Sequence, residues 1–244
     1  MAPRPGPERH PQASAGGRRK RPAPSTRNAK AAAGRAIPPT AAGPREARVE
    51  IWLTGFGGQG VVLAAYIIGR ACTLHAGKSA TMIQSFGPEA RGSSCSATLV
   101  VQDGEVLYPY VRRPTILVAM SAEGYEKFGD QLADDGLLLF ERDLVHPRPL
   151  PAQRAFGISS TRIAESLGRS LIQNIVMVGF FAALAGVVPR AALRAAVHES
   201  VPSGTEELNL AAFDQGAAFA DREFGTAPAL ASALAAASGE EARL

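Results

Sequence analysis

Residues 49–60 read Val-Glu-Ile-Trp-Leu-Thr-Gly-Phe-Gly-Gly-Gln-Gly, and this stretch decides the fold. Residues 49–54 form an apolar run that predicts a short buried strand, and residues 61–76 show the apolar spacing of a helix. The glycines at 55, 57 and 60 therefore make a G-x-G-x-x-G turn between a strand and a helix. This order is typical of a mononucleotide-binding unit and predicts a Rossmann-like α/β fold.

The glycine turn has two interpretations. Backbone N–H groups and the positive end of the following helix point into such a turn, which favours an anionic ligand such as a phosphate. The same glycines would also let the strand and helix pack tightly, or let a neighbouring subunit's loop come close. The candidate residues for contact with a ligand or partner are Gly55, Gly57, Gly58, Gln59 and Gly60.

Apolar segments alternate with helical patterns along the rest of the chain. Strands are expected at residues 79–84, 94–102, 115–120, 136–140 and 156–159, and helices at residues 122–132, from 160, 171–184, from 189 and 209–219. Asp103-Gly104 predicts a hairpin turn that pairs residues 94–102 with residues 106–110. Continuous apolar strands alternating with helices indicate a mostly parallel sheet with helices on both faces, and the β-hairpin is added to it.

The two ends of the chain differ in composition from its centre. Eleven of the 26 Lys and Arg residues precede Val49, so residues 1–48 carry a net charge of about +9 and contain no aromatic residue. Such a segment buries too little apolar surface to offset the entropy of ordering, and we expect a disordered basic tail. Residues 226–244 are expected to form an Ala-rich C-terminal tail, which leaves residues 49–225 as the folded domain.

The basic run at residues 18–21 leaves several interpretations open. It could attract nucleic acid or a membrane surface, or it could mimic an organellar transit peptide. A solvated, functionally silent extension, or a start codon assigned too early, is the preferred interpretation. Residues 49–244 are mildly acidic, and no apolar run reaches the roughly 18–20 uncharged residues that span a bilayer. We therefore expect neither a nucleic-acid nor a membrane partner.

Cysteine and histidine usage disfavours a self-sufficient redox enzyme. Cys72 and Cys95 lack C-x-x-C spacing, so this chain alone can ligate neither zinc nor an iron–sulfur cluster, and both are expected to be buried thiols in a reducing cytoplasm. A nicotinamide site would carry an acidic residue at the end of the second strand, but residues 78–84 contain no carboxylate. None of the four histidines, at positions 10, 75, 146 and 198, is an obvious acid for hydride transfer.

A second loop carries charge in an otherwise small and polar setting. Residues 85–94 read Ser-Phe-Gly-Pro-Glu-Ala-Arg-Gly-Ser-Ser. Glu89 and Arg91 could pair with each other, pair across a subunit boundary, or hold an anionic substrate. The residues alone leave these three possibilities open.

The two loops together resemble the γ subunit of 2-oxoacid:ferredoxin oxidoreductases. The resemblance continues through Tyr108-Pro109, the strand at 115–120, the stretch Gln-Asn-Ile-Val-Met-Val-Gly at 173–179, and Asn209 with residues 212–216. One departure is Ser93-Ser94-Cys95, where many relatives have another glycine, which leaves the fine conformation of the loop open. The loop pattern is closer to the 2-oxoglutarate or branched-chain type than to the pyruvate type.

The resemblance implies a subunit that is inactive alone. The complete enzyme converts a 2-oxoacid, coenzyme A and oxidised ferredoxin to an acyl-CoA, carbon dioxide and reduced ferredoxin. Thiamine diphosphate, magnesium and [4Fe-4S] clusters are expected on partner α and β subunits and often a δ subunit, and coenzyme A is a candidate shared substrate. The chain's role would be assembly, shaping of the active-site rim, or admission of coenzyme A.

The resemblance also selects candidate residues for that rim. They are the five glycine-turn residues already named, together with Ser85, Glu89, Arg91, Gly92 and Asn174. Asn174 either supports the loops or acts as a simple helix N-cap. Two alternatives from other classes stay open: a stand-alone Rossmann-like ligand-binding or regulatory module, and a less favoured NAD-dependent dehydrogenase.

Overall fold

The computed structural model describes residues 48–86 and 94–225, which build one six-stranded sheet in the order β2-β3-β1-β4-β5-β6. The strands are β1 Val49–Phe56, β2 Ser79–Phe86, β3 Ser94–Gln102, β4 Ile116–Ala119, β5 Leu137–Glu141 and β6 Arg154–Ile158. The helices are α1 Val61–Arg70, α2 Ala122–Phe128, α3 Ser160–Ser166, α4 Gln173–Leu184, α5 Arg190–Ser200 and α6 Glu206–Phe224. Short π or 3-10 turns extend or precede some of them: Ala71–His75 (η1), Gly129–Gln131 (η2) and Ser170–Ile172 (η3).

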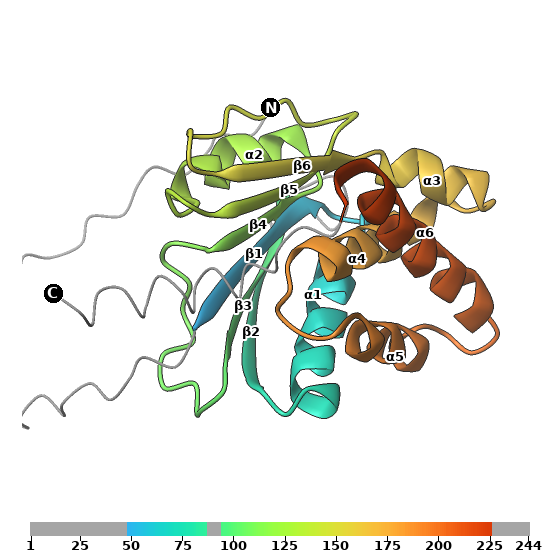
Figure 1. The fold of residues 1–244 in the computed structure, drawn as a ribbon, viewed down its shortest axis with the longest axis horizontal. Coiled ribbons are helices and arrows are strands. Elements are labelled where there is room, and N and C mark those ends of the chain that lie inside the picture. Colours follow the sequence, from blue (N-terminus) through green and yellow to red (C-terminus); the bar gives the residue numbers. More distant parts are fainter. Residues whose placement is uncertain (1–47, 87–93, 226–244) are drawn as a thin grey trace, which may run out of the picture. The chain divides into compact units, whose positions relative to one another are not determined.

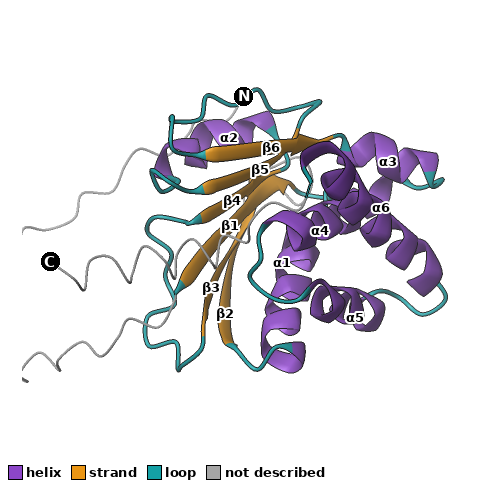
Figure 2. Ribbon diagram, in the orientation of Figure 1, coloured by secondary structure: helices purple, strands orange, loops and turns teal. Residues whose placement is uncertain are grey.

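Strand direction confirms the mostly parallel sheet. β1, β4, β5 and β6 pair in parallel, while β3 runs antiparallel between β1 and β2. Helices cover both faces, with α1, α4, α5 and α6 on one side and α2 on the other (Figure 1, Figure 2). The Rossmann-like α/β prediction is therefore confirmed.

The predicted hairpin between residues 94–102 and residues 106–110 is wrong. β3 pairs with β2, in register from Ser79 opposite Gln102 to Phe86 opposite Cys95, and residues 106–110 form neither a strand nor a helix. Pro109 has no backbone N–H to donate to a ladder. The carbonyls of Tyr108 and Tyr110 instead accept hydrogen bonds from the Arg48 side chain.

Alternation along β1 assigns its side chains to two cores. Ile51 and Leu53 belong to the large cluster with α1 and α4, whereas Trp52 packs with the smaller cluster of Leu117, Leu138 and Phe128 beneath α2. The rings of Trp52 and Phe128 lie 4.4 Å apart. This two-sided burial explains why β1 is apolar along nearly its whole length.

Helix α4 is the central helix of the larger layer. All its residues except Gln173 and Ala183 are buried, and it packs against α6 through glycines. A Cβ at Gly179 would lie 1.9 Å from the carbonyl oxygen of Phe213, and one at Gly216 would lie 2.0 Å from that of Val176. The two backbones therefore approach as closely as only glycine permits.

None of the helices formed by residues 48–86 and 94–225 combines the length and the apolar character that a membrane span requires.

Candidate functional site

The glycine loop and the Ser85 end of β2 lie at the same edge of the sheet. Gly55 and Phe86 both pair with Cys95 of β3, and Thr54 and Ser85 both pair with Ser96. One strand therefore separates β1 from β2 at this edge, a spacing of roughly 10 Å. Ser85 is exposed there. Glu89, Arg91 and Gly92 lie outside the described residues, so their predicted place beside the glycine loop stays a prediction.

The glycine loop leads into α1 through left-handed backbone. Gly58 has φ 102° and Gly60 has φ 75°, values that L-residues rarely adopt. Gly60 is the N-cap of α1, which has no side-chain cap and no acidic residue in its first turn. Gly58 is exposed, and nothing lies within 4 Å of where its Cβ would be. The N-terminus of α1 thus retains the positive dipole end that suits an anion.

Gly55 and Gly60 also meet a packing requirement. A Cβ at Gly55 would lie 2.5 Å from Gln59 Oε1, and one at Gly60 would lie 2.5 Å from Asn174 Nδ2. These two glycines let other side chains approach the backbone, whereas Gly58 faces open space. Gly57 is half-buried between them. The packing interpretation therefore holds for Gly55 and Gly60, and contact of Gly58 with a ligand or partner stays a prediction.

The side chain of Gln59 connects the loop to the neighbouring strand. Its Oε1 accepts a hydrogen bond from the Phe56 N–H at 2.7 Å, and its Nε2 donates to the carbonyl of Met120 at 3.0 Å. Met120 directly follows β4. The chain leaves β1 for α1 on one face of the sheet and leaves β4 for α2 on the other face, so this hydrogen bond lies at the topological switch point between β1 and β4. Sequence reasoning missed this internal role of Gln59, and its contact with a ligand stays a prediction.

Asn174 supports the loop from beneath. It is buried, and its Nδ2 donates to the carbonyl of Gly60 at 3.2 Å. The N-cap alternative is wrong, because Asn174 is the second residue of α4 and Ile172 occupies the cap. The structure thus brings Asn174 to the glycine loop from more than a hundred residues away.

A buried carboxylate at the same edge was not predicted. Glu141 ends β5 and accepts hydrogen bonds from the Ser160 hydroxyl and from the Thr161 N–H, the latter at 3.1 Å. These bonds hold the start of α3 against the sheet, so the role of Glu141 is structural. The sequence signal that could have predicted this contact was an acidic residue at the end of an apolar strand, followed later by Ser160-Thr161.

The two cysteines are buried and unpaired, as predicted. Burial raises the pKa of the Cys72 thiol to about 12, and burial also raises the pKa of Cys95. Within residues 48–86 and 94–225, no group of three or more His, Cys, Asp or Glu side chains is placed to hold a metal ion. The donor set of the described residues therefore does not fit a metal ion or an iron–sulfur cluster.

The chain is similar to known proteins over most of its described residues. Residues 50–219 match the family model described as pyruvate ferredoxin/flavodoxin oxidoreductase. A 2-oxoglutarate synthase subunit KorC from Methanocaldococcus jannaschii is 41% identical over 172 residues, covering 69% of this chain and 92% of that protein. The crystal structure of a keto/oxoacid ferredoxin oxidoreductase gamma subunit from Geobacter sulfurreducens is 34% identical with a TM-score of 0.62, covering 70% of this chain and 96% of that one.

Two proteins named for other oxoacids are less similar. A ketoisovalerate oxidoreductase subunit VorA from Methanothermobacter thermautotrophicus is 30% identical over 148 residues, covering 61% of this chain and 31% of that protein. A pyruvate synthase subunit PorC from the same organism is 32% identical over 166 residues, covering 66% and 89%. With the family model matching more than half of its length, the chain belongs to the pyruvate ferredoxin/flavodoxin oxidoreductase family.

Proposed function

We propose that this chain is the γ-type subunit of a thiamine-diphosphate-dependent 2-oxoglutarate:ferredoxin oxidoreductase. The observation that carries the proposal is the 41% identity to a 2-oxoglutarate synthase subunit along nearly the whole of that subunit. The proteins named for ketoisovalerate and pyruvate are about ten percentage points less similar. The 2-oxoglutarate type is therefore preferred to the branched-chain type, which the loop pattern alone left equal.

The proposed reaction oxidises a 2-oxoacid at its keto carbon. One 2-oxoglutarate and one coenzyme A yield succinyl-CoA, carbon dioxide and one proton, and the two electrons released pass singly to two oxidised ferredoxins. Thiamine diphosphate, magnesium and [4Fe-4S] clusters are proposed to reside on partner α, β and δ subunits. This chain would position and enclose the reacting groups rather than carry electrons.

We further propose that the glycine loop helps to admit coenzyme A. Gly58 and the uncapped start of α1 offer an exposed, positively polarised surface to one of its phosphates. Ser85 lies one strand away at the same edge and leads into the loop that carries Glu89 and Arg91. In this proposal Arg91 contacts the anion and Glu89 orients Arg91. Gln59 and Asn174 hold the loop in shape through their bonds to Met120 and Gly60.

Co-expression with candidate partner subunits tests the proposed function. The complex purified through this chain should reduce ferredoxin or a viologen dye in a coenzyme-A-dependent reaction, faster with 2-oxoglutarate than with pyruvate or ketoisovalerate. Higher kcat/KM for pyruvate would contradict the substrate assignment. Separation of this chain from all partners as a stable, inactive monomer would contradict the subunit assignment.

Arg91→Ala separates the two roles left open for the second loop. If Arg91 contacts coenzyme A, the variant should assemble normally but show a raised KM for coenzyme A. Removing a charged hydrogen bond to a phosphate costs about 1.5–3 kcal/mol, or roughly tenfold to a hundredfold in kcat/KM. Weaker assembly with an unchanged KM would instead make the loop an interface element.

We also propose a cytoplasmic location, which the two unpaired, buried cysteines support. Residues 1–48 and 226–244 are proposed to be extensions that flank the oxidoreductase domain at 49–225.

A further inference from the structure

The loop between β3 and β4 lies at the other end of the sheet from the glycine loop. It follows Gln102, whose neighbour Val101 pairs with the first residue of β1, and it runs through residues 103–115 without a helix or strand. Loops of this length without secondary structure are uncommon in compact domains and are usually functional. Residues 103–115, here called the tyrosine loop, were singled out in sequence by Tyr108-Pro109 and are not used by the proposed reaction.

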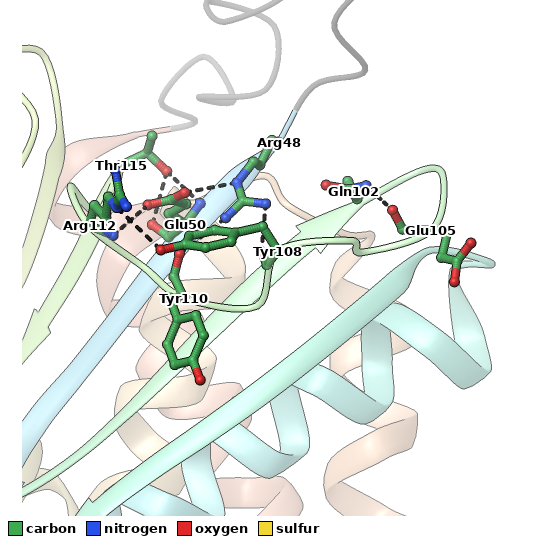
Figure 3. A network of polar contacts seen from close by, with 8 residues as sticks. All are labelled: Arg48, Glu50, Gln102, Glu105, Tyr108, Tyr110, Arg112 and Thr115. Carbon is green, nitrogen blue, oxygen red and sulfur yellow. Dashed lines mark hydrogen bonds and ion pairs between the residues drawn. The ribbon is translucent and has the colours of Figure 1, made fainter. Parts of the chain in front are cut away.

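The tyrosine loop is held rigidly to β1. The Arg48 guanidinium donates to the carbonyls of Tyr108 and Tyr110 at 2.9 and 3.2 Å (Figure 3). Its Nε donates to Glu50 at 2.8 Å, and the other oxygen of Glu50 accepts from the backbone N–H of Arg112 at 3.2 Å. Two charged side chains, Arg48 just before β1 and Glu50 within it, thus fix the path of the loop. A loop fixed in advance loses little entropy when it binds a partner.

The loop presents large apolar side chains to solvent. Leu107 is 84% exposed, Tyr110 is 58% exposed and Tyr108 is 44% exposed. The two tyrosine rings meet edge to face at 5.4 Å, and Tyr110 points away from the polar network that anchors the loop (Figure 3). Three exposed large side chains within four residues are typical of an interaction surface, and tyrosine and arginine are enriched at the centres of protein interfaces.

The charge of the tyrosine loop indicates which kind of side chain its partner would carry. Arg112 lies over the Tyr108 ring at 5.4 Å, and its Nε donates to the Tyr108 hydroxyl at 3.3 Å. Arg48 and Arg113 are matched by Glu50 and Asp134, but the Arg112 side chain forms no ion pair with any residue that the structure describes. A cation supported by an aromatic ring and lacking a carboxylate complements an acidic side chain at an interface.

We propose that the tyrosine loop docks another subunit of the same oxidoreductase complex, through an apolar surface that carries a carboxylate opposite Arg112. Leu107 and Tyr110 supply the apolar contact, and Arg112 supplies the ion pair. The proposal rests on the proposed function, because it takes the occupant from the complex. Its place opposite the glycine loop separates this contact from the one at which the glycine loop faces the partner subunits' cofactors.

A competition experiment tests this surface in the full-length chain. A variant and the natural chain, told apart by mass, are co-expressed at equal levels with the partner subunits. The complex is purified through an affinity tag on a partner subunit, and mass spectrometry gives the ratio of the two incorporated chains. Leu107→Ser and Arg112→Glu are the test variants. Leu74→Ser and Arg222→Glu are the matched controls, since Leu74 is 61% exposed in η1 and the Arg222 side chain is 64% exposed on α6.

We expect each test variant to be incorporated about tenfold less than the natural chain, as for residues at the centre of an interface, and each control within twofold of it. The melting temperature of Leu107→Ser should be unchanged because its side chain contacts mainly solvent. If the melting temperature of Arg112→Glu is lower than that of the natural chain, the incorporation ratio of Leu107→Ser alone tests the proposal. Incorporation of Leu107→Ser within twofold of the natural chain would overturn the proposal.

The two proposals fail in different ways. If the natural chain enters an active complex and Leu107→Ser enters it equally well, only the docking surface is wrong. If the natural chain enters no complex, the proposed function is wrong and the docking surface is wrong with it.

Discussion

At the residue scale, the two left-handed glycines of the glycine loop differ in what surrounds them. Gly58→Ala places a methyl group in open space and should cost about 1 kcal/mol for the left-handed backbone alone. Gly60→Ala also drives that methyl group against Asn174 and should cost about 2–4 kcal/mol. Urea unfolding of the two variants measures both values. Equal losses would show that Asn174 does not support the loop.

The buried thiol of Cys72 predicts a pH dependence of stability. Its pKa is raised by burial from 9.0 to about 12, so the folded state favours the protonated thiol. Its contribution to the free energy of unfolding is complete below about pH 9 and is lost as the pH rises from 9 towards 12, because the unfolded thiol ionises first. Urea unfolding at pH 8 and pH 10 should show a larger loss for the natural chain than for Cys72→Ala. Parallel losses would contradict a buried, protonated Cys72.

The sequence predicted which residues surround the glycine loop better than it predicted what they do. The types and spacing of Gly55 to Gly60 marked the turn, but nothing local shows that Gln59 turns inward to Met120. The contact between Asn174 and Gly60 depends on where α4 packs, and tertiary packing is not encoded in the few residues around position 174. Long-range contacts of this kind require the assembled fold.

At the scale of single elements, α4 and α6 cross with their backbones in close contact at Gly179 and Gly216. Gly179→Ala and Gly216→Ala should each lower the free energy of unfolding by about 3 kcal/mol or more, because each methyl group would overlap a backbone carbonyl that cannot move aside. Gly69→Ala in α1 is the control: its methyl group would meet only the end of the Leu99 side chain at 3.3 Å.

That control should leave stability unchanged or raise it by up to about 1 kcal/mol, since alanine favours the helix. Thermal or denaturant unfolding of the three variants measures the difference. A loss at Gly69→Ala as large as that at Gly179→Ala would show that the effect is general to helical glycines rather than specific to the crossing.

Most elements followed from periodicity, and the exception has a physical explanation. The strands at 94–102 and 136–140 and the helix at 171–184 were found within a few residues of their observed bounds. The prediction of a second hairpin strand at residues 106–110 was wrong. It relied on the Asp-Gly turn signal alone and did not foresee that the Arg48 side chain would bind the carbonyls of residues 108 and 110. Hydrogen bonds from Arg48, which lies just before β1 and far away in the sequence, hold a segment whose own residues favoured pairing.

At the scale of the whole molecule, the sheet order explains how two distant loops form one edge. The antiparallel insertion of β3 between β1 and β2 brings Gly55 and Ser85 to a common end, while the tyrosine loop lies at the opposite end. Sequence motifs identified the loops at Gly55 and Ser85. They could not predict the order of the strands in the sheet, because strand pairing is set by long-range packing. The chain therefore presents two separated surfaces, consistent with a subunit that contacts reacting groups at one end and a partner at the other.

Omission and add-back of this chain tests the central claim most directly. Partner subunits expressed without it should show little coenzyme-A-dependent reduction of ferredoxin by 2-oxoglutarate, and addition of the purified chain should restore the activity in proportion to the chain bound. Full activity of the partner subunits without the chain, or no gain when the chain is added and bound, would contradict the account.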